Sequence, residues 1–131
     1  MANTSSRNRF LEIIEKYRSR NMSVPIVVEG RNDLKSLRKM KFLGEILILN
    51  RGMSLVEFSD RIAERYRHII LLTDFDAKGC DLEKRMSEYL MGMGVDIDIY
   101  LWNFVRRNVP VKTVEELPSE YERQYEKTVQ M

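Results

Sequence analysis

The chain has 131 residues, of which 44% are hydrophobic and 32% are charged, and its net charge is +2. No apolar run approaches the roughly 18 residues that a membrane-spanning helix needs. A single cysteine excludes an internal disulfide and a cysteine-based zinc site. These features are typical of a cytoplasmic globular protein, and we expect residues 1–131 to form a single domain that does not contact a membrane.

Helices and strands alternate from the start of the chain. The helical spacing of apolar residues predicts a helix over 5–20, and Pro25 precedes an apolar strand over 26–29. A turn at Gly30 then leads to a helix over 32–41. The first strand is apolar almost throughout, which is typical of a strand covered by helices on both faces.

The same alternation continues through the middle of the chain. Strands are predicted over 45–50 and 68–73, helices over 55–66 and 81–92, and a fourth strand over 95–102. Strands that alternate with helices across short connections form a parallel sheet. The predicted fold class is therefore α/β.

The fourth predicted strand differs from the others because charged residues interrupt it. Asp96 and Asp98 project to one side, opposite the aliphatic residues, which indicates an edge strand with a solvated face. The expected spatial order of the strands is 2-1-3-4, which leaves this strand at an edge. A basic connector that contains Arg106 and Arg107 should then lead to a last helix from about residue 119.

Acidic residues stand at the ends of two predicted strands. Glu29 ends the first strand, and Asp74 and Asp76 follow the third. In the order 2-1-3-4 these strands are neighbours, and open parallel sheets bind ligands where the strand order reverses. Carboxylates in one crevice repel each other, and a bound cation removes that cost. Glu29, Asp74 and Asp76 are therefore the candidate metal ligands. Oxygen ligands without histidine or cysteine favour Mg²⁺ first and Mn²⁺ next.

Glycine and basic residues near these acids suit a phosphate ligand. Gly30 precedes a helix whose first amides favour an anion. Asp33 either supports the site or is a first-turn acid favoured by the helix dipole, and Lys78 either reaches a phosphate or is an exposed loop charge. We expect basic side chains to bind the phosphates of a nucleic acid: Arg31, Lys35, Arg38, Lys78, Arg106 and Arg107.

Three stretches resemble the toprim domain of topoisomerases, bacterial-type primases, recombination-repair proteins and old-family nucleases: IVVEGRND, LNRG and ILLTDFDAKG. The resemblance covers about residues 24–102 and leaves a C-terminal connector and helix over 103–131. The chain is similar in size to small stand-alone toprim proteins, which include the ribonucleases that mature 5S ribosomal RNA and uncharacterised archaeal proteins.

The toprim resemblance implies a Rossmann-like fold of three layers and a role for each matching residue. Asp74 and Asp76 would hold Mg²⁺, and Glu29 would act as general acid or base beside the metal. Gly52 would be the glycine after the second strand, and Gly79 the one after the D-x-D motif.

Two positions depart from the topoisomerase pattern. Lys78 and Cys80 stand where type IA topoisomerases have acids, which disfavours a second metal site. The sequence therefore predicts a Mg²⁺-dependent, nuclease-like phosphodiesterase, with RNA slightly preferred over DNA. The alternative is a non-catalytic toprim module that binds nucleic acid or a partner, and a homodimer or a ribonucleoprotein partner stays open. A haloacid-dehalogenase-type phosphatase is disfavoured, because its D-x-D strand comes first in the fold.

Overall fold

The computed structural model describes residues 6–49 and 51–130. Its elements in chain order are α1 (Ser6–Asn21), β1 (Ile26–Val28), α2 (Arg31–Lys39), β2 (Ile46–Ile48), α3 (Leu55–Arg65), β3 (His68–Leu71), α4 (Ala77–Gly92), β4 (Asp96–Asp98), α5 (Tyr100–Asn108), the 3-10 helix η1 (Val114–Glu116) and α6 (Leu117–Val129). The predicted start of the first helix at residue 5 and the predicted end of the second strand at residue 50 lie outside the described residues. No described helix is both long and apolar enough to cross a membrane.

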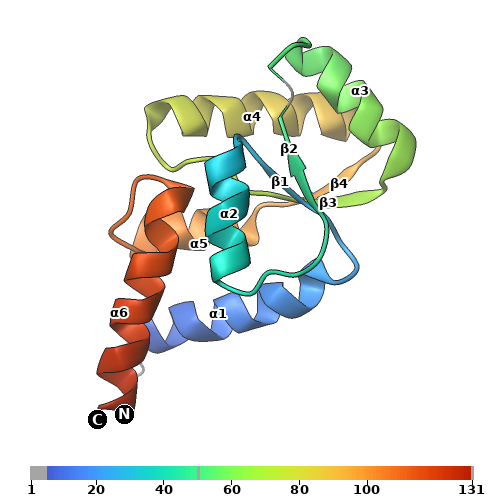
Figure 1. Cartoon of the computed structure of the whole chain (residues 1–131). Coiled ribbons are helices and arrows are strands. Elements are labelled where there is room, and N and C mark those ends of the chain that lie inside the picture. Colours follow the sequence, from blue (N-terminus) through green and yellow to red (C-terminus); the bar gives the residue numbers. More distant parts are fainter. Residues whose placement is uncertain (1–5, 50, 131) are drawn as a thin grey trace.

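The four strands form one parallel sheet in the order β2-β1-β3-β4. Helices α3 and α4 cover one face of the sheet, and α1, α2, α5 and α6 cover the other (Figure 1). This three-layer arrangement confirms the predicted α/β fold and strand order. It also confirms that the strand order reverses between β1 and β3.

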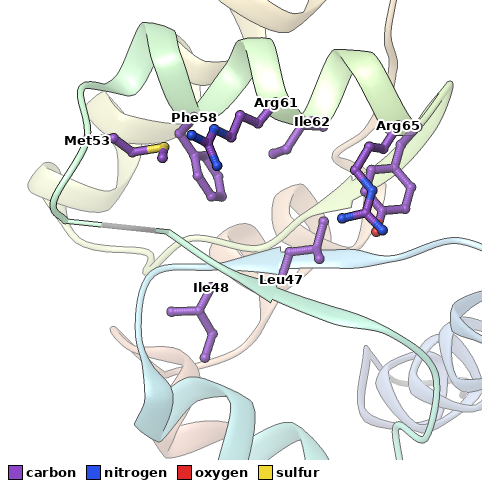
Figure 2. A pocket seen from close by; sticks show the side chains of 8 residues that line it. Leu47, Ile48, Met53, Phe58, Arg61, Ile62 and Arg65 are labelled. Atoms are coloured by element: carbon purple, nitrogen blue, oxygen red, sulfur yellow. The ribbon is translucent and has the colours of Figure 1, made fainter.

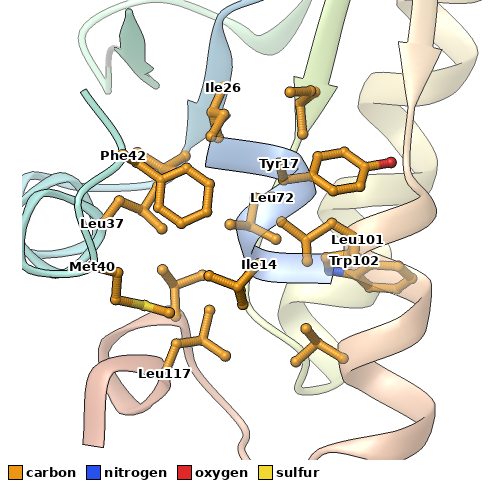
Figure 3. Packing of buried hydrophobic residues seen from close by; sticks show 14 of the residues in the cluster. Ile14, Tyr17, Ile26, Leu37, Met40, Phe42, Leu72, Leu101, Trp102 and Leu117 are labelled. Atoms are coloured by element: carbon orange, nitrogen blue, oxygen red, sulfur yellow. The ribbon is translucent and has the colours of Figure 1, made fainter. Parts of the chain in front are cut away.

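The side chains of each strand divide between two hydrophobic clusters. In β1, Ile26 and Val28 pack into the cluster under α1, α2, α5 and α6, whereas Val27 packs into the cluster under α3 and α4. This division follows from the alternation of side chains along a strand. Figure 3 shows Leu101 and Trp102 of α5 in the larger cluster, where they pack among residues from α1 and the sheet.

The prediction of a long fourth strand followed by a loop is wrong. The strand ends at Asp98, and α5 runs from Tyr100 to Asn108. The Asp98 carboxylate accepts a hydrogen bond from the amide of Tyr100 (2.9 Å). This contact forms a turn that redirects the chain into the helix. The basic residues predicted in a connector therefore lie in the last turn of α5.

The prediction of a solvated face on this strand holds for one aspartate and fails for the other. The side chain of Asp96 is 73% exposed and lies 3.2 Å from the ring of His68. The side chain of Asp98 is only 16% exposed and accepts hydrogen bonds from the Tyr17 hydroxyl (2.9 Å) and Arg20 Nε (2.8 Å). Asp98 therefore attaches α1 to the edge of the sheet.

Helix α4 begins four residues earlier than predicted and packs tightly on the end of β3. Gly79 lies in its first turn, and a Cβ atom at this position would overlap the backbone carbonyl of Asp74. The Thr73 hydroxyl donates to the carbonyl oxygen of Gly79 (2.9 Å), which ties the same two segments together. Only a glycine permits this approach, so Gly79 fixes where Asp74 lies relative to α4.

We predict that Gly79→Ala destabilises the protein by more than about 2 kcal/mol, because the added Cβ must push the first turn of α4 away from Asp74. Gly92 is the matched control, since it lies in the same helix with no atom near its Cβ position. Gly92→Ala should leave stability unchanged or raise it by up to about 1 kcal/mol. Urea denaturation of both variants provides the measurement, and equal stabilities would contradict the packing described.

Candidate functional site

A cleft of about 390 Å³ opens at the carboxyl ends of the strands, where the strand order reverses. Acidic and basic side chains share its walls. Its lining residues are Glu29, Gly30, Arg31, Asn32, Asp33, Ile48, Leu49, Arg51, Asp74 and Glu115. The structure therefore brings Glu29, which follows β1, together with Asp74, which follows β3, as the sequence predicted.

Asp74 is the residue on which the segments around the cleft converge. Its amide donates to Glu29 Oε2 (2.8 Å), which joins the segments after β1 and β3. Its carbonyl oxygen accepts from Trp102 Nε1 of α5 (3.2 Å). Its carboxylate Oδ1 accepts from the amide of Val114 at the start of η1 (2.9 Å). These three bonds, together with the packing of Gly79, fix both the backbone and the carboxylate of Asp74.

The sequence did not predict the contribution of residues 112–116 to the site. The Phe75 amide donates to the carbonyl oxygen of Lys112 (2.9 Å), so this segment runs beside the D-x-D motif. It brings the Val114 amide to Asp74 and adds Glu115 to the cleft. A backbone amide has no sequence signature. The two adjacent glutamates at 115 and 116 were a signal for the extra acid, but nothing in the sequence connected them to this sheet edge.

Asp33 caps a helix and also lies at the wall of the cleft, and its role in a site stays a prediction. The Asp33 carboxylate accepts a hydrogen bond from the amide of Gly30 (3.0 Å) and so caps α2. Asp33 is also one of the residues that line the cleft. Burial is the largest cause that raises the pKa of Asp33 to about 6, and the nearby charge of Asp74 is the second. Burial also raises the pKa of Asp74, with further contributions from Glu29, Asp76 and Glu115 that the Val114 amide opposes. Negative charge is therefore concentrated and costly in this cleft.

Asp76 follows Asp74 by two residues, but its carboxylate contacts the start of α4 and not the cleft. Its carboxylate Oδ1 accepts from the amide of Gly79 (2.8 Å) and caps α4, and Asp76 is not among the residues that line the cleft. In residues 6–49 and 51–130, no three His, Cys, Asp or Glu side chains are grouped so that they could hold a metal ion. The ligand set of Glu29, Asp74 and Asp76 stays a prediction.

The donor chemistry of the cleft nevertheless suits a hard divalent cation. Mg²⁺ is usually bound by one or two protein carboxylates, with water and substrate phosphate as the other ligands. Glu29 and Asp74 supply such a pair at the cleft wall. Burial raises the pKa of Asp74 and the neighbouring carboxylates add to the shift, and a bound cation would stabilise the ionised carboxylate against both effects.

The basic residues predicted to bind phosphate lie in different places. Arg31 lines the cleft, together with Arg51, which was not among the predicted phosphate-binding residues. Lys35 is exposed on α2. Arg38 points instead to the end of its own helix, where Nη1 donates to the carbonyl oxygens of Phe42 (2.7 Å) and Gly44 (2.8 Å).

The remaining predicted contacts lie outside the cleft. Lys78 is exposed in the first turn of α4, and Arg107 is exposed in the last turn of α5. Arg106 donates from Nε to the sulfur of Cys80 (3.1 Å), and its guanidinium lies 5.7 Å from the centre of the Trp102 ring. Gly52 lies in the turn before α3.

The charge of Asp33 leads to a prediction about pH. Since the pKa of Asp33 is about 6 in the folded protein and 3.8 in an unfolded chain, the folded protein binds the proton more tightly, and stability falls as pH rises from 3.8 to 6. Asp33→Asn remains neutral and keeps an oxygen that can accept from the Gly30 amide. At pH 7 the variant should be more stable than the native chain by about 2 kcal/mol.

Urea denaturation at several pH values checks this expectation. The difference between the two proteins should disappear near pH 4, where the native carboxyl group is protonated when folded. A variant that is less stable than the native chain at pH 7 would show that the carboxylate stabilises the fold when charged.

Comparison with known proteins supports the sequence resemblance. The toprim domain family matches residues 24–103. A UPF0292 protein of Thermoplasma volcanium is 58% identical over 119 residues, which cover 91% of this chain and 100% of that protein. A UPF0292 protein of Thermococcus gammatolerans is 40% identical over 111 residues, which cover 83% of this chain and 80% of that protein.

A solved structure of an Aquifex aeolicus protein has a similar fold. It superposes with a TM-score of 0.67 and 25% sequence identity, and the match covers 88% of this chain and 99% of that chain. The domain match includes Glu29, Asp74, Asp76 and Gly79, whereas Val114 lies beyond it. Because the domain match spans more than half of the chain and the relatives match most of it, the chain belongs to the toprim family and, within it, to the small UPF0292 proteins.

Proposed function

We propose that this toprim protein is a Mg²⁺-dependent phosphodiesterase that acts on nucleic acid, with RNA slightly preferred over DNA. The observation that carries the proposal is the 2.8 Å hydrogen bond from the Asp74 amide to the Glu29 carboxylate. This bond holds the glutamate after β1 beside the D-x-D motif after β3, at a cleft of about 390 Å³ that Arg31 and Arg51 also line.

The chain's own residues would divide the work of phosphodiester cleavage. Glu29 and Asp74 would hold Mg²⁺, joined by Asp76 if its carboxylate leaves the end of α4. The bound ion would neutralise charge on the scissile phosphate and lower the pKa of a bound water. Glu29 would also move the proton between the water and the leaving oxygen, as a general base and then a general acid.

Basic side chains at the cleft wall would position the nucleic acid. Arg31 and Arg51 line the cleft beside the acids, where they would bind the phosphates on either side of the scissile one. Exposed cations farther away would add binding that depends on salt and not on base sequence: Lys35, Lys78 and Arg107.

Glu29→Gln and Asp74→Asn should each abolish Mg²⁺-dependent cleavage, because each removes a carboxylate of the cleft while preserving its shape. Asp96→Asn is the matched control, since Asp96 is exposed at the opposite end of the strands. The assay follows cleavage of structured RNA, single strands and nicked duplexes with and without chelator, and circular dichroism confirms that each variant is folded.

This design separates the proposed site from a contaminating nuclease. Loss of cleavage in the two cleft variants alone supports the assignment. Cleavage that persists in both of them, or in excess chelator, would overturn it.

A binding module without catalysis is the second candidate, and the capping contact of Asp76 favours it. In the structure this carboxylate serves the first turn of α4, and no group of three acids is assembled for a metal in the described residues. Such a module would bind structured RNA equally well with Mg²⁺ and with chelator, and would show no turnover. Tight, metal-independent binding together with intact substrate would establish it.

A further inference from the structure

The cleft includes one acid from outside the part of the chain that matches the toprim family. Glu115 lies in η1, whereas the match ends at residue 103. Val114 before it and Leu117 after it are completely buried in the hydrophobic cluster under α1, α2, α5 and α6. The Val114 amide also donates to the Asp74 carboxylate (2.9 Å). The core and the D-x-D motif therefore both hold this segment in place, with Glu115 at the wall of the cleft.

Glu115 differs from the other acids of the cleft because it has no partner. Each of the others accepts a hydrogen bond from a backbone amide: Glu29 from Asp74, Asp33 from Gly30 and Asp74 from Val114. The Glu115 carboxylate is exposed and forms no hydrogen bond or ion pair with any other residue in 6–49 and 51–130, including the arginines that line the same cleft. No contact within the described chain explains why an acid stands here.

The charge of Glu115 also makes the other acids of the cleft harder to ionise. Burial is the largest cause that raises the pKa of both Asp33 and Asp74, and the charge of Glu115 adds to each rise. Glu115 therefore lies close enough to these two side chains to repel them when all are ionised. An unpaired acid that repels its neighbours destabilises the folded chain, and a bound cation reverses that effect.

Glu116 shows the structural use of an acid in the same segment. Its Oε1 accepts hydrogen bonds from the amides of Lys112 (2.6 Å) and Thr113 (3.0 Å) and so caps the start of η1. These bonds lower the pKa of Glu116, because they stabilise its charged form. The two adjacent glutamates thus have different surroundings, since Glu116 closes a turn while Glu115 faces the cleft without a partner among the described residues.

The hollow beside the cleft has no such acids. A groove of about 240 Å³ lies between β2 and α3, and Ile48 lines both this groove and the cleft. Figure 2 shows that apolar side chains and two arginines surround the groove: Leu47, Met53, Phe58, Ile62, Arg61 and Arg65. No described residue that lines it is acidic. Of these two neighbouring hollows, only the cleft at the strand ends concentrates carboxylates.

We propose that Glu115 is a positioning residue for the metal ion of the cleft and acts on the ion through water. This role rests on the proposed function, in which Glu29 and Asp74 hold Mg²⁺. In the described residues no three acids are grouped to hold an ion directly, and Mg²⁺ bound by few carboxylates keeps several waters. The Glu115 carboxylate accepts hydrogen bonds from these waters, and its charge complements that of the ion. Contacts outside the direct ligands tune metal affinity in this way.

Metal binding measured without substrate tests this role. Titration with Mn²⁺, followed by the electron paramagnetic resonance signal of the free ion, gives the affinity of each variant. Glu115→Gln should weaken Mn²⁺ binding by about tenfold or more, because it removes the charge that faces the waters of the ion. Glu116→Gln is the matched control, since it removes the same charge one residue away and keeps an oxygen that can cap η1. Its affinity for Mn²⁺ should stay close to that of the native chain.

Stability in the absence of metal separates this role from a structural one. Because the Glu115 carboxylate has no partner in the described residues and repels Asp33 and Asp74, Glu115→Gln should unfold at the same urea concentration as the native chain or at a higher one. A variant that unfolds at a lower concentration would show that Glu115 supports the fold, and would overturn the proposal.

Glu29→Gln separates failure of this proposal from failure of the proposed function. If Glu29→Gln weakens Mn²⁺ binding and Glu115→Gln does not, the cleft still holds the ion and only the role of Glu115 is overturned. Equal weakening by Glu115→Gln and Glu116→Gln would also overturn that role, since loss of charge anywhere in the segment would then explain the result. A native chain that binds no Mn²⁺ would overturn both proposals.

Discussion

The architecture of the candidate site depends on the restraint of one residue, Asp74. Its amide, carbonyl and carboxylate each have a hydrogen-bond partner, and the partners come from three separate segments: Glu29 after β1, Trp102 in α5 and Val114 in η1. The absent side chain of Gly79 lets α4 close against the same backbone. A carboxylate that is held this way cannot move away from its acidic neighbours, so their repulsion is built into the folded state.

That repulsion connects the fold to the chemistry of the cleft. Burial and nearby carboxylates raise the pKa of both Asp33 and Asp74. Ionising these two side chains therefore costs more free energy in the cleft than in water. A divalent cation offsets this penalty, and a cation held by few protein ligands keeps positions free for phosphate oxygens. Arg31 and Arg51 add positive charge at the same wall. The cleft thus combines carboxylates, the ligands that Mg²⁺ prefers, with guanidinium groups, which pair well with phosphate.

The features that sequence reasoning found were those that interrupt an apolar pattern. Glu29 and the D-x-D motif stand out because apolar strands precede them. The alternation of elements then indicated a parallel sheet, and the charged fourth strand agreed with an order that leaves it at an edge. The alternating charges at 96–98 also led to an error, because the pattern suggested that the strand continued. Leu101, Trp102 and Val105 have helical spacing and are buried, which was the available signal for α5. The amide of Val114 could not be found this way, since every residue type except proline supplies one.

The most direct test of the central claim is the location of a paramagnetic ion in the folded protein. Mn²⁺ added in substoichiometric amounts should broaden the NMR amide signals of Gly30, Asp74 and Val114, which surround the cleft, and excess Mg²⁺ should restore them. The signal of Asp96, at the other end of the sheet, should stay sharp. Broadening centred away from the cleft, or none at any Mn²⁺ concentration, would contradict a metal-dependent site at Asp74.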